Sequence, residues 1–248
     1  MSRSPGAPTL RRQAGGGLLV AAACSAIDTT DALRAAHYGD AAQRIGAGGR
    51  GSAWIVPSAC GEAVLREYRR GGLFGRFVRR SYLWRGVHAS RCVREFRLTL
   101  RLRELGLPVP APLAAAWWRH GPVYEQALLT GRIPGAEPLG ALLRHGAPDL
   151  PWRAVGALIA RFHAVGLDHA DLNANNLMRD AEGALWLIDF DRCTLGRPDA
   201  RRAQANLQRL ARSLVKLGGE RQGRAAYARV QDGWQAAGGL TAWPGRGT

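Results

Sequence analysis

Two acidic side chains and one carboxamide stand at spacings that suit phosphoryl transfer. His169 and Asp171 open the pattern H-x-D-L-x-x-x-N, Asn176 lies five residues after Asp171, and Asp189 lies eighteen after it. Transfer of the terminal phosphoryl group of ATP needs an Asp that orients the attacking hydroxyl and accepts its proton. It also needs an Asn and a second Asp to hold the Mg²⁺ that neutralises the phosphates. We therefore predict Asp171 as the base and Asn176 and Asp189 as magnesium ligands.

A simpler interpretation of Asp171 alone is a turn, because Asn and Asp side chains hydrogen-bond their own backbone and tolerate left-handed conformations. The surrounding pattern favours the chemical interpretation. Asn176 falls at the required spacing, Gly183 marks a turn, and the apolar run 185–188 ends at Asp189. A tight loop that leads into a hairpin would bring the two carboxylates and the carboxamide to one small volume.

A glycine-rich run precedes this loop in the chain. Gly46, Gly48 and Gly51 form a G-x-G-x-x-G pattern between two segments that are typical of strands. Such glycines let backbone N–H groups approach phosphates closely. The motif alone is weak, because the chain contains 32 glycines. Its place strengthens it, since Gly51 lies 15 residues before Arg66, at the end of the strand-like run 63–66.

Helix and strand signals predict an α+β, bilobal chain. We expect a flexible tail over residues 1–16, an N-lobe over 17–130 and a C-lobe over 131–248. A charged amphipathic helix begins near Arg91 and stops at the Pro-rich segment 106–112. The other expected elements are strands near 18–23, 113–118 and 123–129, partly helical sequence at 28–43, and helices at 152–165, 199–217 and 223–236.

The charge balance favours anionic partners. The chain carries 35 basic and 19 acidic residues, for a net charge of +16 and an isoelectric point near 11.3. Arginines and aromatic residues alternate from Arg66 to Arg85, which suits an anionic lipid interface. The alternative is a solvated face with aromatic residues in the core. No nucleic-acid recognition motif is present, so we expect no nucleic-acid partner.

The four cysteines carry little information. Cys24, Cys60, Cys92 and Cys193 show no C-x-x-C spacing and no paired His ligands, so a zinc site is not expected and no disulfide can be assigned. A reduced, cytosolic setting fits best. Residues 11–24 faintly resemble a signal peptide that ends in a lipidated cysteine, but the apolar part is short and begins with three glycines. We expect no export and no membrane span, because no apolar run approaches 18 residues.

Longer strings of sequence point to one family. The order of motifs resembles the protein-kinase-like fold over nearly the whole chain, and more narrowly the 3-deoxy-D-manno-octulosonic acid (Kdo) kinase family. This resemblance implies a small antiparallel β-rich N-lobe and a mainly helical C-lobe. The strings that carry it are G-G-R-G-S-A-W at 48–54, L-R-E-Y-R-R-G-G at 65–72, Y-L-W-R-G at 82–86, E-F-R-L at 95–98, L-G-L-P-V-P at 105–110, D-L-N-A-N-N-L-M at 171–178 and I-D-F-D-R at 188–192.

The resemblance also implies an activity. Members would use ATP and Mg²⁺ to phosphorylate the 4-hydroxyl of Kdo on a lipid A precursor during lipopolysaccharide core biosynthesis. They would act as peripheral proteins at the cytoplasmic face of the inner membrane. On this basis His169 would support the catalytic loop, and Gly46, Gly48 and Gly51 would cover the nucleotide.

Two positions depart from the kinase pattern. Arg66 stands where kinases carry the lysine that grips the α- and β-phosphates, and Lys216 is the only lysine in the chain. We predict that Arg66 binds phosphate, with a planar fork in place of a point charge, and pairs with Glu95. The alternative for Glu95 is a solvated charge on the helix surface. Asp191 replaces the glycine of D-F-G, and is either a further metal or supporting ligand or a partner of Arg192.

Other functions remain open at this level. A heptose kinase of lipopolysaccharide assembly and an antibiotic-type phosphotransferase share the fold, although the latter usually has an acidic pocket that this composition disfavours. A non-catalytic pseudokinase that binds anionic membranes is supported only by the missing lysine at position 66. A nucleic-acid-binding protein would show tight, salt-sensitive binding to DNA or RNA without ATP chemistry.

Overall fold

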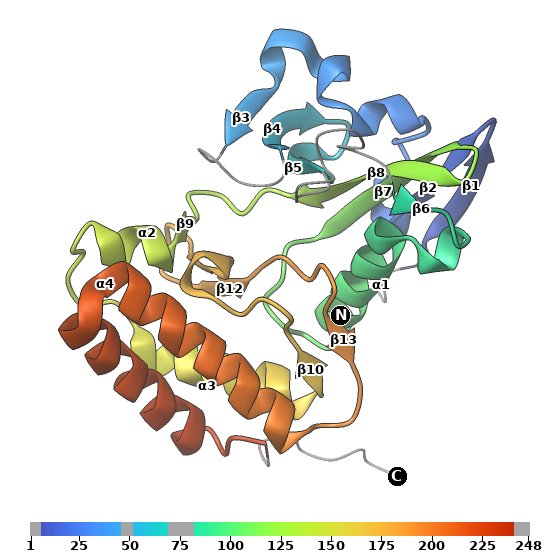
Figure 1. Ribbon diagram of the computed structural model, residues 1–248. Helices are drawn as coiled ribbons and strands as arrows, with labels where there is room; N and C mark the ends of the chain where they lie inside the picture. Colours follow the sequence, from blue (N-terminus) through green and yellow to red (C-terminus); the bar gives the residue numbers. More distant parts are fainter. Residues whose placement is uncertain (1–5, 46–51, 69–81, 241–248) are drawn as a thin grey trace. The chain divides into compact units, whose positions relative to one another are not determined.

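The computed structural model describes residues 6–45, 52–68 and 82–240. The chain divides into two compact units (Figure 1). Unit 1 comprises Met1–Leu105 and Pro110–Arg132, and unit 2 comprises Gly106–Val109 and Ile133–Thr248. An antiparallel sheet dominates the first unit and helices dominate the second, so the predicted α+β, bilobal architecture is confirmed.

Unit 1 is built on one antiparallel sheet with the strand order β1-β2-β7-β8-β5-β4-β3 and a short β6 beside β8. Hairpins join β1 to β2, β4 to β5 and β7 to β8, and each turns at a glycine with positive φ, namely Gly15, Gly61 and Gly121. The strands are β1 (Thr9–Gln13), β2 (Gly16–Val20), β3 (Gln43–Ile45), β4 (Ser52–Ser58), β5 (Gly61–Glu67), β6 (Tyr82–Leu83), β7 (Pro112–His120) and β8 (Val123–Gly131).

The two faces of this sheet carry separate apolar layers, because successive side chains of a strand point to opposite faces. On one face Leu18 and Val20 pack with Leu33 from the short 3₁₀ segments between β2 and β3. On the other face Leu19 packs with Phe96 of α1 (Arg91–Glu104). The helix start predicted near Arg91 is confirmed.

The expectation of a flexible tail over residues 1–16 is wrong for the described part of that segment. Strand β1 pairs with β2 in antiparallel register, from Thr9 opposite Val20 to Gln13 opposite Gly16. The guanidinium of Arg11 also donates hydrogen bonds to the carbonyls of Ser25, at 3.1 Å, and Ile27, at 3.2 Å. Glycine-rich composition misled the prediction, because the glycines here form the turn and allow close backbone packing.

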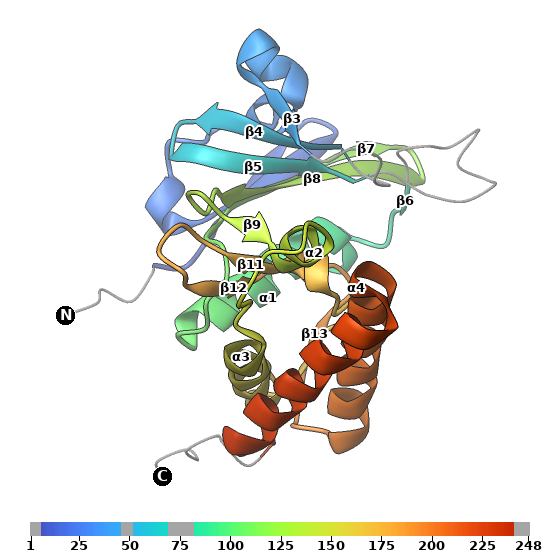
Figure 2. The same cartoon turned by 90° about the vertical axis from the view of Figure 1, so that its left-hand side faces the viewer.

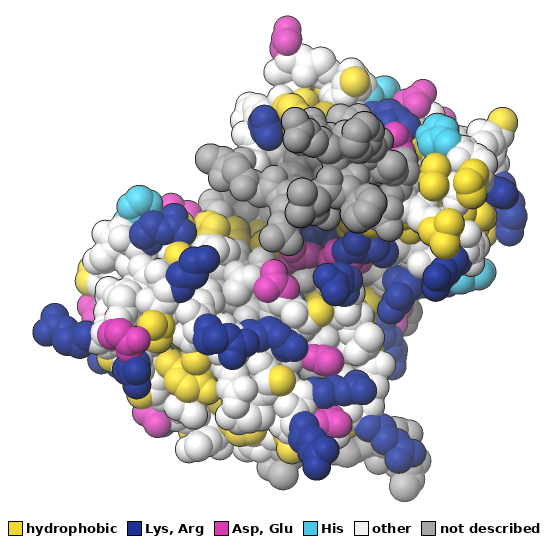
Figure 3. Space-filling model, in the orientation of Figure 1, with side chains coloured by type: hydrophobic (Ala, Val, Ile, Leu, Met, Phe, Trp, Pro, Cys, Tyr) yellow, Lys and Arg dark blue, Asp and Glu magenta, His cyan; other side chains and the backbone are white. Residues whose placement is uncertain are grey.

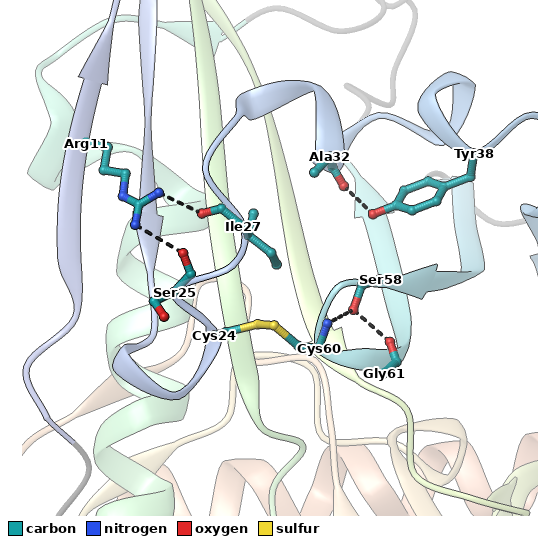
Figure 4. The surroundings of a disulfide bond; sticks show 9 residues. All are labelled: Arg11, Cys24, Ser25, Ile27, Ala32, Tyr38, Ser58, Cys60 and Gly61. Carbon is teal, nitrogen blue, oxygen red and sulfur yellow. Dashed lines mark hydrogen bonds between the residues drawn. A yellow bond between two sulfur atoms is a disulfide. The ribbon is translucent and has the colours of Figure 1, made fainter.

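A disulfide between Cys24 and Cys60 corrects the expectation of reduced cysteines for this pair (Figure 4). It ties the 3₁₀ turn after β2 to the β4–β5 turn, across a sequence separation of 36, with Cα atoms 5.8 Å apart. Cys92 and Cys193 are free and buried. Sequence spacing could not reveal the bond, because the folded sheet, not chain proximity, brings the two cysteines together.

We predict that reduction of this bond destabilises the protein. A closed loop of 36 residues corresponds to about 3–4 kcal/mol of lost chain entropy in the unfolded state. Urea unfolding of the wild type should therefore shift to lower urea when dithiothreitol is added. The Cys60→Ala variant should unfold at the urea concentration of the reduced wild type, whether or not dithiothreitol is present. Four free thiols in the denatured wild type, with no effect of reductant, would contradict the bond.

Unit 2 is mainly helical. Its helices are α2 (Leu139–Arg144), α3 (Trp152–Ala164) and α4 (Ala200–Ala236), and its short strands are β9 (Glu137–Pro138), β10 (Leu167–Asp168), β11 (Leu177–Arg179), β12 (Leu185–Leu187) and β13 (Thr194–Leu195). The helices predicted at 199–217 and 223–236 are the two arms of α4, which are joined at the non-helical Gly219. Figures 1 and 2 show the arms side by side.

Glycines let α3 and the second arm of α4 approach closely. A Cβ atom at Gly156 of α3 would collide with the Val230 backbone, and one at Gly233 would collide with Arg153. Beside this contact, Trp234 Nε1 donates a 3.0 Å hydrogen bond to His163 Nδ1. Burial lowers the pKa of His163 to about 4, so the ring is a neutral acceptor at pH 7. Within the described ranges, no helix has both the length and the apolar character to cross a membrane.

Candidate active site

The loop after β10 in unit 2 carries the predicted catalytic residues. Asn176 closes this loop, since its Nδ2 donates a 2.9 Å hydrogen bond to the backbone carbonyl of Asp171. Asn173 makes the local turn, because its Oδ1 accepts from the Asn175 N–H at 2.9 Å. Asn176 is 9% exposed, whereas Asp171 is exposed to solvent. The side chain that forms the turn is therefore that of Asn173, not that of Asp171. The Asp171 carboxylate remains accessible to a hydroxyl group.

His169 connects this loop to the segment that carries Asp189. The ring is buried, and its Nε2 lies 3.1 Å from the carbonyl oxygen of Ile188. A carbonyl only accepts hydrogen bonds, so Nε2 carries the hydrogen and the tautomer is defined. Burial lowers the pKa of His169 and keeps the ring neutral. The predicted supporting role of His169 agrees with this geometry.

Asn206 of α4 holds the start of the same loop through two hydrogen bonds, and the sequence analysis did not predict this role. Its side chain is fully buried; Oδ1 accepts from the His169 N–H at 2.8 Å, and Nδ2 donates to Asp168 Oδ1 at 2.8 Å. Two turns along the helix, Ser213 Oγ accepts from the Ala174 N–H at 3.1 Å. One signal was available, because Asn is a poor residue for a helix interior and implies a specific hydrogen-bonding role.

Asp189 follows β12 at the end of a short hairpin. Strands β11 and β12 pair Leu177 with Leu187, and the Ile188 N–H donates to the Asn176 carbonyl at 3.0 Å. This pairing brings the backbone next to Asp189 against Asn176. Asp189 itself has a φ of 63°, a left-handed conformation that costs of order 1 kcal/mol in a residue other than glycine. Strain of this kind is typical of functional positions.

Asp191, which replaces the glycine of D-F-G, lies in a turn after Asp189. The Asp191 N–H points at Asp189 Oδ1, 3.4 Å away, so the chain after Asp189 turns back on its carboxylate. Cys193 Sγ then accepts a 3.4 Å hydrogen bond from the Ala170 N–H and ties this turn to the catalytic loop. The role of the Asp191 carboxylate, as ligand or as partner of Arg192, stays a prediction.

The donor set of this loop suits a magnesium ion. The Asn176 amide nitrogen is directed to the Asp171 carbonyl, which leaves the amide oxygen as the group that can face a cation. Asp189 supplies a carboxylate, and Mg²⁺ prefers such hard oxygen ligands together with phosphate and water. Among the residues that the structure describes, no group of three or more His, Cys, Asp or Glu side chains is placed to bind a metal. Asn176 and Asp189 as magnesium ligands stay a prediction.

Unit 1 contains the predicted pair of Arg66 and Glu95. The Arg66 guanidinium forms an ion pair with the Glu95 carboxylate, as predicted. The Glu95 side chain is only 4% exposed, so the alternative of a solvated surface charge is wrong. Arg66 is 24% exposed and retains access to solvent.

Tyr68 completes this cluster and was not predicted. Its hydroxyl donates to Glu95 and accepts a 3.0 Å hydrogen bond from Arg66, whose guanidinium carbon lies 4.8 Å from the ring centroid. Burial raises the pKa of Tyr68 well above its usual value, which keeps the hydroxyl protonated as a donor. The available signal was strand periodicity, because residues two apart in extended chain share a face and Tyr68 directly follows β5.

Some predictions fall outside the described residues. Gly46, Gly48 and Gly51 lie there, as does 69–81 of the basic stretch that begins at Arg66. At the described end of that stretch, Tyr82 and Trp84 pack on Tyr124, with ring centroids 5.7 and 5.3 Å away. Both are partly buried and pack against the apolar core of unit 1, which agrees in part with the alternative of aromatic residues in the core. Leu83 between them is 57% exposed.

Comparison with known proteins agrees with this geometry. The model of the lipopolysaccharide kinase (Kdo/WaaP) family matches residues 39–234. The chain belongs to this family. It is 48% identical over 192 residues, 77% of each chain, to the 3-deoxy-D-manno-octulosonic acid kinase of Xylella fastidiosa (strain M23).

Two further relatives carry the same name. The protein of Stenotrophomonas maltophilia (strain R551-3) is 49% identical over 185 residues, 75% of this chain and 74% of its own. That of Xanthomonas euvesicatoria pv. vesicatoria (strain 85-10) is 47% identical over 203 residues, 81% of this chain and 82% of its own. Membership in the Kdo/WaaP family makes this chain an ATP-dependent kinase and confirms the predicted resemblance.

For a Kdo/WaaP kinase with arginine at position 66, we predict that Tyr68→Phe impairs ATP binding. The substitution removes the hydroxyl that orients both Arg66 and Glu95. The KM for ATP should rise roughly two- to tenfold, as expected for loss of one typical hydrogen bond worth about 0.5–1.5 kcal/mol, because Arg66 keeps its ion pair with Glu95. Steady-state kinetics at saturating acceptor measure this change.

Tyr38→Phe is the matched control for this substitution. It also removes one part-buried hydroxyl of unit 1, which donates to the Ala32 carbonyl at 2.8 Å. It should leave the KM for ATP unchanged. If both variants bound ATP like the wild type, Tyr68 would have no positioning role.

Proposed function

We propose that this protein is a Kdo kinase that transfers a phosphoryl group from ATP to the 4-hydroxyl of Kdo on a lipid A precursor, in lipopolysaccharide core biosynthesis. The observation that carries the proposal is the solvent-exposed Asp171 on a loop fixed by Asn176, His169 and Asn206. Family membership and the names of the relatives support the choice of acceptor.

Each step of the transfer has a candidate residue. Asp171 hydrogen-bonds the acceptor hydroxyl and takes its proton while the oxygen attacks the γ-phosphorus of ATP. A new O–P bond forms as the bond from the γ-phosphorus to the bridging oxygen breaks, and ADP leaves. Arg66, oriented by Glu95 and Tyr68, binds phosphate oxygens.

Magnesium belongs to the proposal. When bound, Mg²⁺ neutralises the phosphate charge that builds up during transfer. Asn176 and Asp189 would hold it through one carboxamide oxygen and one carboxylate. The pairing of β11 with β12 supports this assignment, because the Ile188 N–H donates to the Asn176 carbonyl and brings the backbone next to Asp189 against Asn176.

A peripheral position at the cytoplasmic face of the inner membrane is also part of the proposal. The acceptor is an amphiphile, so the enzyme must meet it at an anionic surface, and a net charge of +16 favours such an encounter. Leu83, at 57% exposure beside Arg85, is a described residue suited to insertion between headgroups.

We predict that Asp171→Asn abolishes most of the transfer without loss of structure. Asparagine keeps the shape of the side chain but cannot accept the proton, so kcat should fall roughly 10²- to 10⁴-fold. Radioactive transfer from γ-labelled ATP to a Kdo-bearing lipid A precursor measures the rate, with a heptose-terminated acceptor in parallel. Asp232→Asn, at an exposed position of α4, is the control and should be fully active.

Two outcomes would contradict this assignment. Full activity of Asp171→Asn would remove Asp171 from catalysis. Faster transfer to the heptose-terminated acceptor than to the Kdo-bearing one would place the protein with heptose kinases instead.

A further inference from the structure

A groove runs between the two arms of α4. The chain reverses at Gly219, which has a φ of 73°, and Gly223 then lies against the backbone of Leu214 and Val215. The groove has a volume of about 530 Å³. Its floor includes the apolar or aromatic side chains of Ala211, Val215 and Tyr227. Its rim carries the cationic side chains of Arg212, Lys216 and Arg224.

The rim of this groove is positively charged. Arg224 pairs with Glu220 on the same helix. Arg212 and Lys216 are exposed and have no acidic partner within the described part of the chain. Lys and Arg side chains gather over α4 on the face drawn in Figure 3. The groove therefore presents two uncompensated cations above an apolar floor.

This combination suits one kind of ligand. Cations favour phosphate groups, and an apolar floor favours hydrocarbon, so an anionic amphiphile satisfies both. A volume of 530 Å³ lies in the range of sites for discrete ligands, about 300–1,000 Å³, whereas a bilayer surface needs no concave site. Burial raises the pKa of Tyr227, so its hydroxyl stays protonated on the groove floor and can donate to an anion.

The groove and the catalytic loop both contact the first arm of α4. Arg212 is adjacent in sequence to Ser213, whose Oγ holds the Ala174 N–H of that loop. Lys216 follows three residues later, which is about 4.5 Å along a helix axis. The first arm of α4 thus carries the cations on one face and the loop contacts on a neighbouring face.

We propose that this groove binds the phosphate-bearing, acylated part of the acceptor. The inference rests on the proposed function, since it assigns a second contact to the same substrate. Binding energy from this remote part would hold the acceptor while its sugar hydroxyl reacts at Asp171.

The test compares two charge-matched double variants. Arg212→Gln/Lys216→Gln removes the uncompensated cations of the groove. Arg201→Gln/Arg221→Gln removes two exposed arginines of the same helix that do not line it. Each is assayed with Kdo-bearing lipid A precursor in detergent micelles, with and without the phosphates of that precursor.

The groove variant should raise the KM for the phosphorylated acceptor roughly tenfold, as expected for loss of charge-assisted contacts. The kcat, the KM for ATP and the KM for the dephosphorylated acceptor should be unchanged, and the control should match the wild type throughout. Ala228→Trp, which fills the groove without a change of charge, should also raise the KM for the phosphorylated acceptor.

Three results would overturn the proposal. The first is an equal effect of both double variants. The second is an unchanged KM in Arg212→Gln/Lys216→Gln. The third is a loss confined to sedimentation with phosphatidylglycerol vesicles, which would assign the groove to the bilayer.

Direct binding separates this proposal from the proposed function. The Kd of the phosphorylated acceptor, measured by calorimetry, should rise in the groove variant even without any transfer. If the wild type bound the acceptor through the groove but did not phosphorylate it, the proposed function would fail and the binding site would stand.

Discussion

The hydrogen bonds of Asn206 are the interaction on which unit 2 depends. One buried side chain binds the His169 backbone and the Asp168 carboxylate, and it also bonds the Arg202 carbonyl of its own helix. A buried polar group that loses its partners costs about 1–3 kcal/mol, so these bonds hold the loop in one conformation. Two further hydrogen bonds complete the arrangement. The His169 ring donates to the Ile188 carbonyl, and the Asn176 amide donates to the Asp171 carbonyl, so the backbone around the candidate catalytic groups is held in place.

In unit 1 the main electrostatic constraint is the buried carboxylate of Glu95. Glu95 is a nearly buried carboxylate, and it is tolerated because Arg66 and Tyr68 both donate to it. The same contacts orient the Arg66 guanidinium, which replaces the usual lysine. A planar fork needs such orientation more than a flexible ammonium does, because it binds phosphate along defined directions. The Tyr68 hydroxyl, which bonds both Arg66 and Glu95, contributes to this orientation.

Much of the fold followed from local sequence signals. The helix at Arg91, the strand that ends near Arg66 and the loop from His169 to Asn176 carry strong periodicity or spacing, and the structure contains all of them. The misses have two causes. Strand β1 forms a local hairpin with β2, and glycine-rich composition concealed it. The Cys24–Cys60 bond and the contacts of Asn206 depend on partners far away in the sequence, and no local pattern encodes such a pairing.

The most direct test of the central claim is to locate the phosphate in the product. The purified protein would be incubated with ATP, Mg²⁺ and a Kdo-bearing lipid A precursor, and the product analysed by mass spectrometry and phosphorus NMR. We expect a single added phosphate on the 4-hydroxyl of Kdo, with an equal amount of ADP. Consumption of ATP without a phosphate on Kdo, or a phosphate on another sugar, would contradict the account.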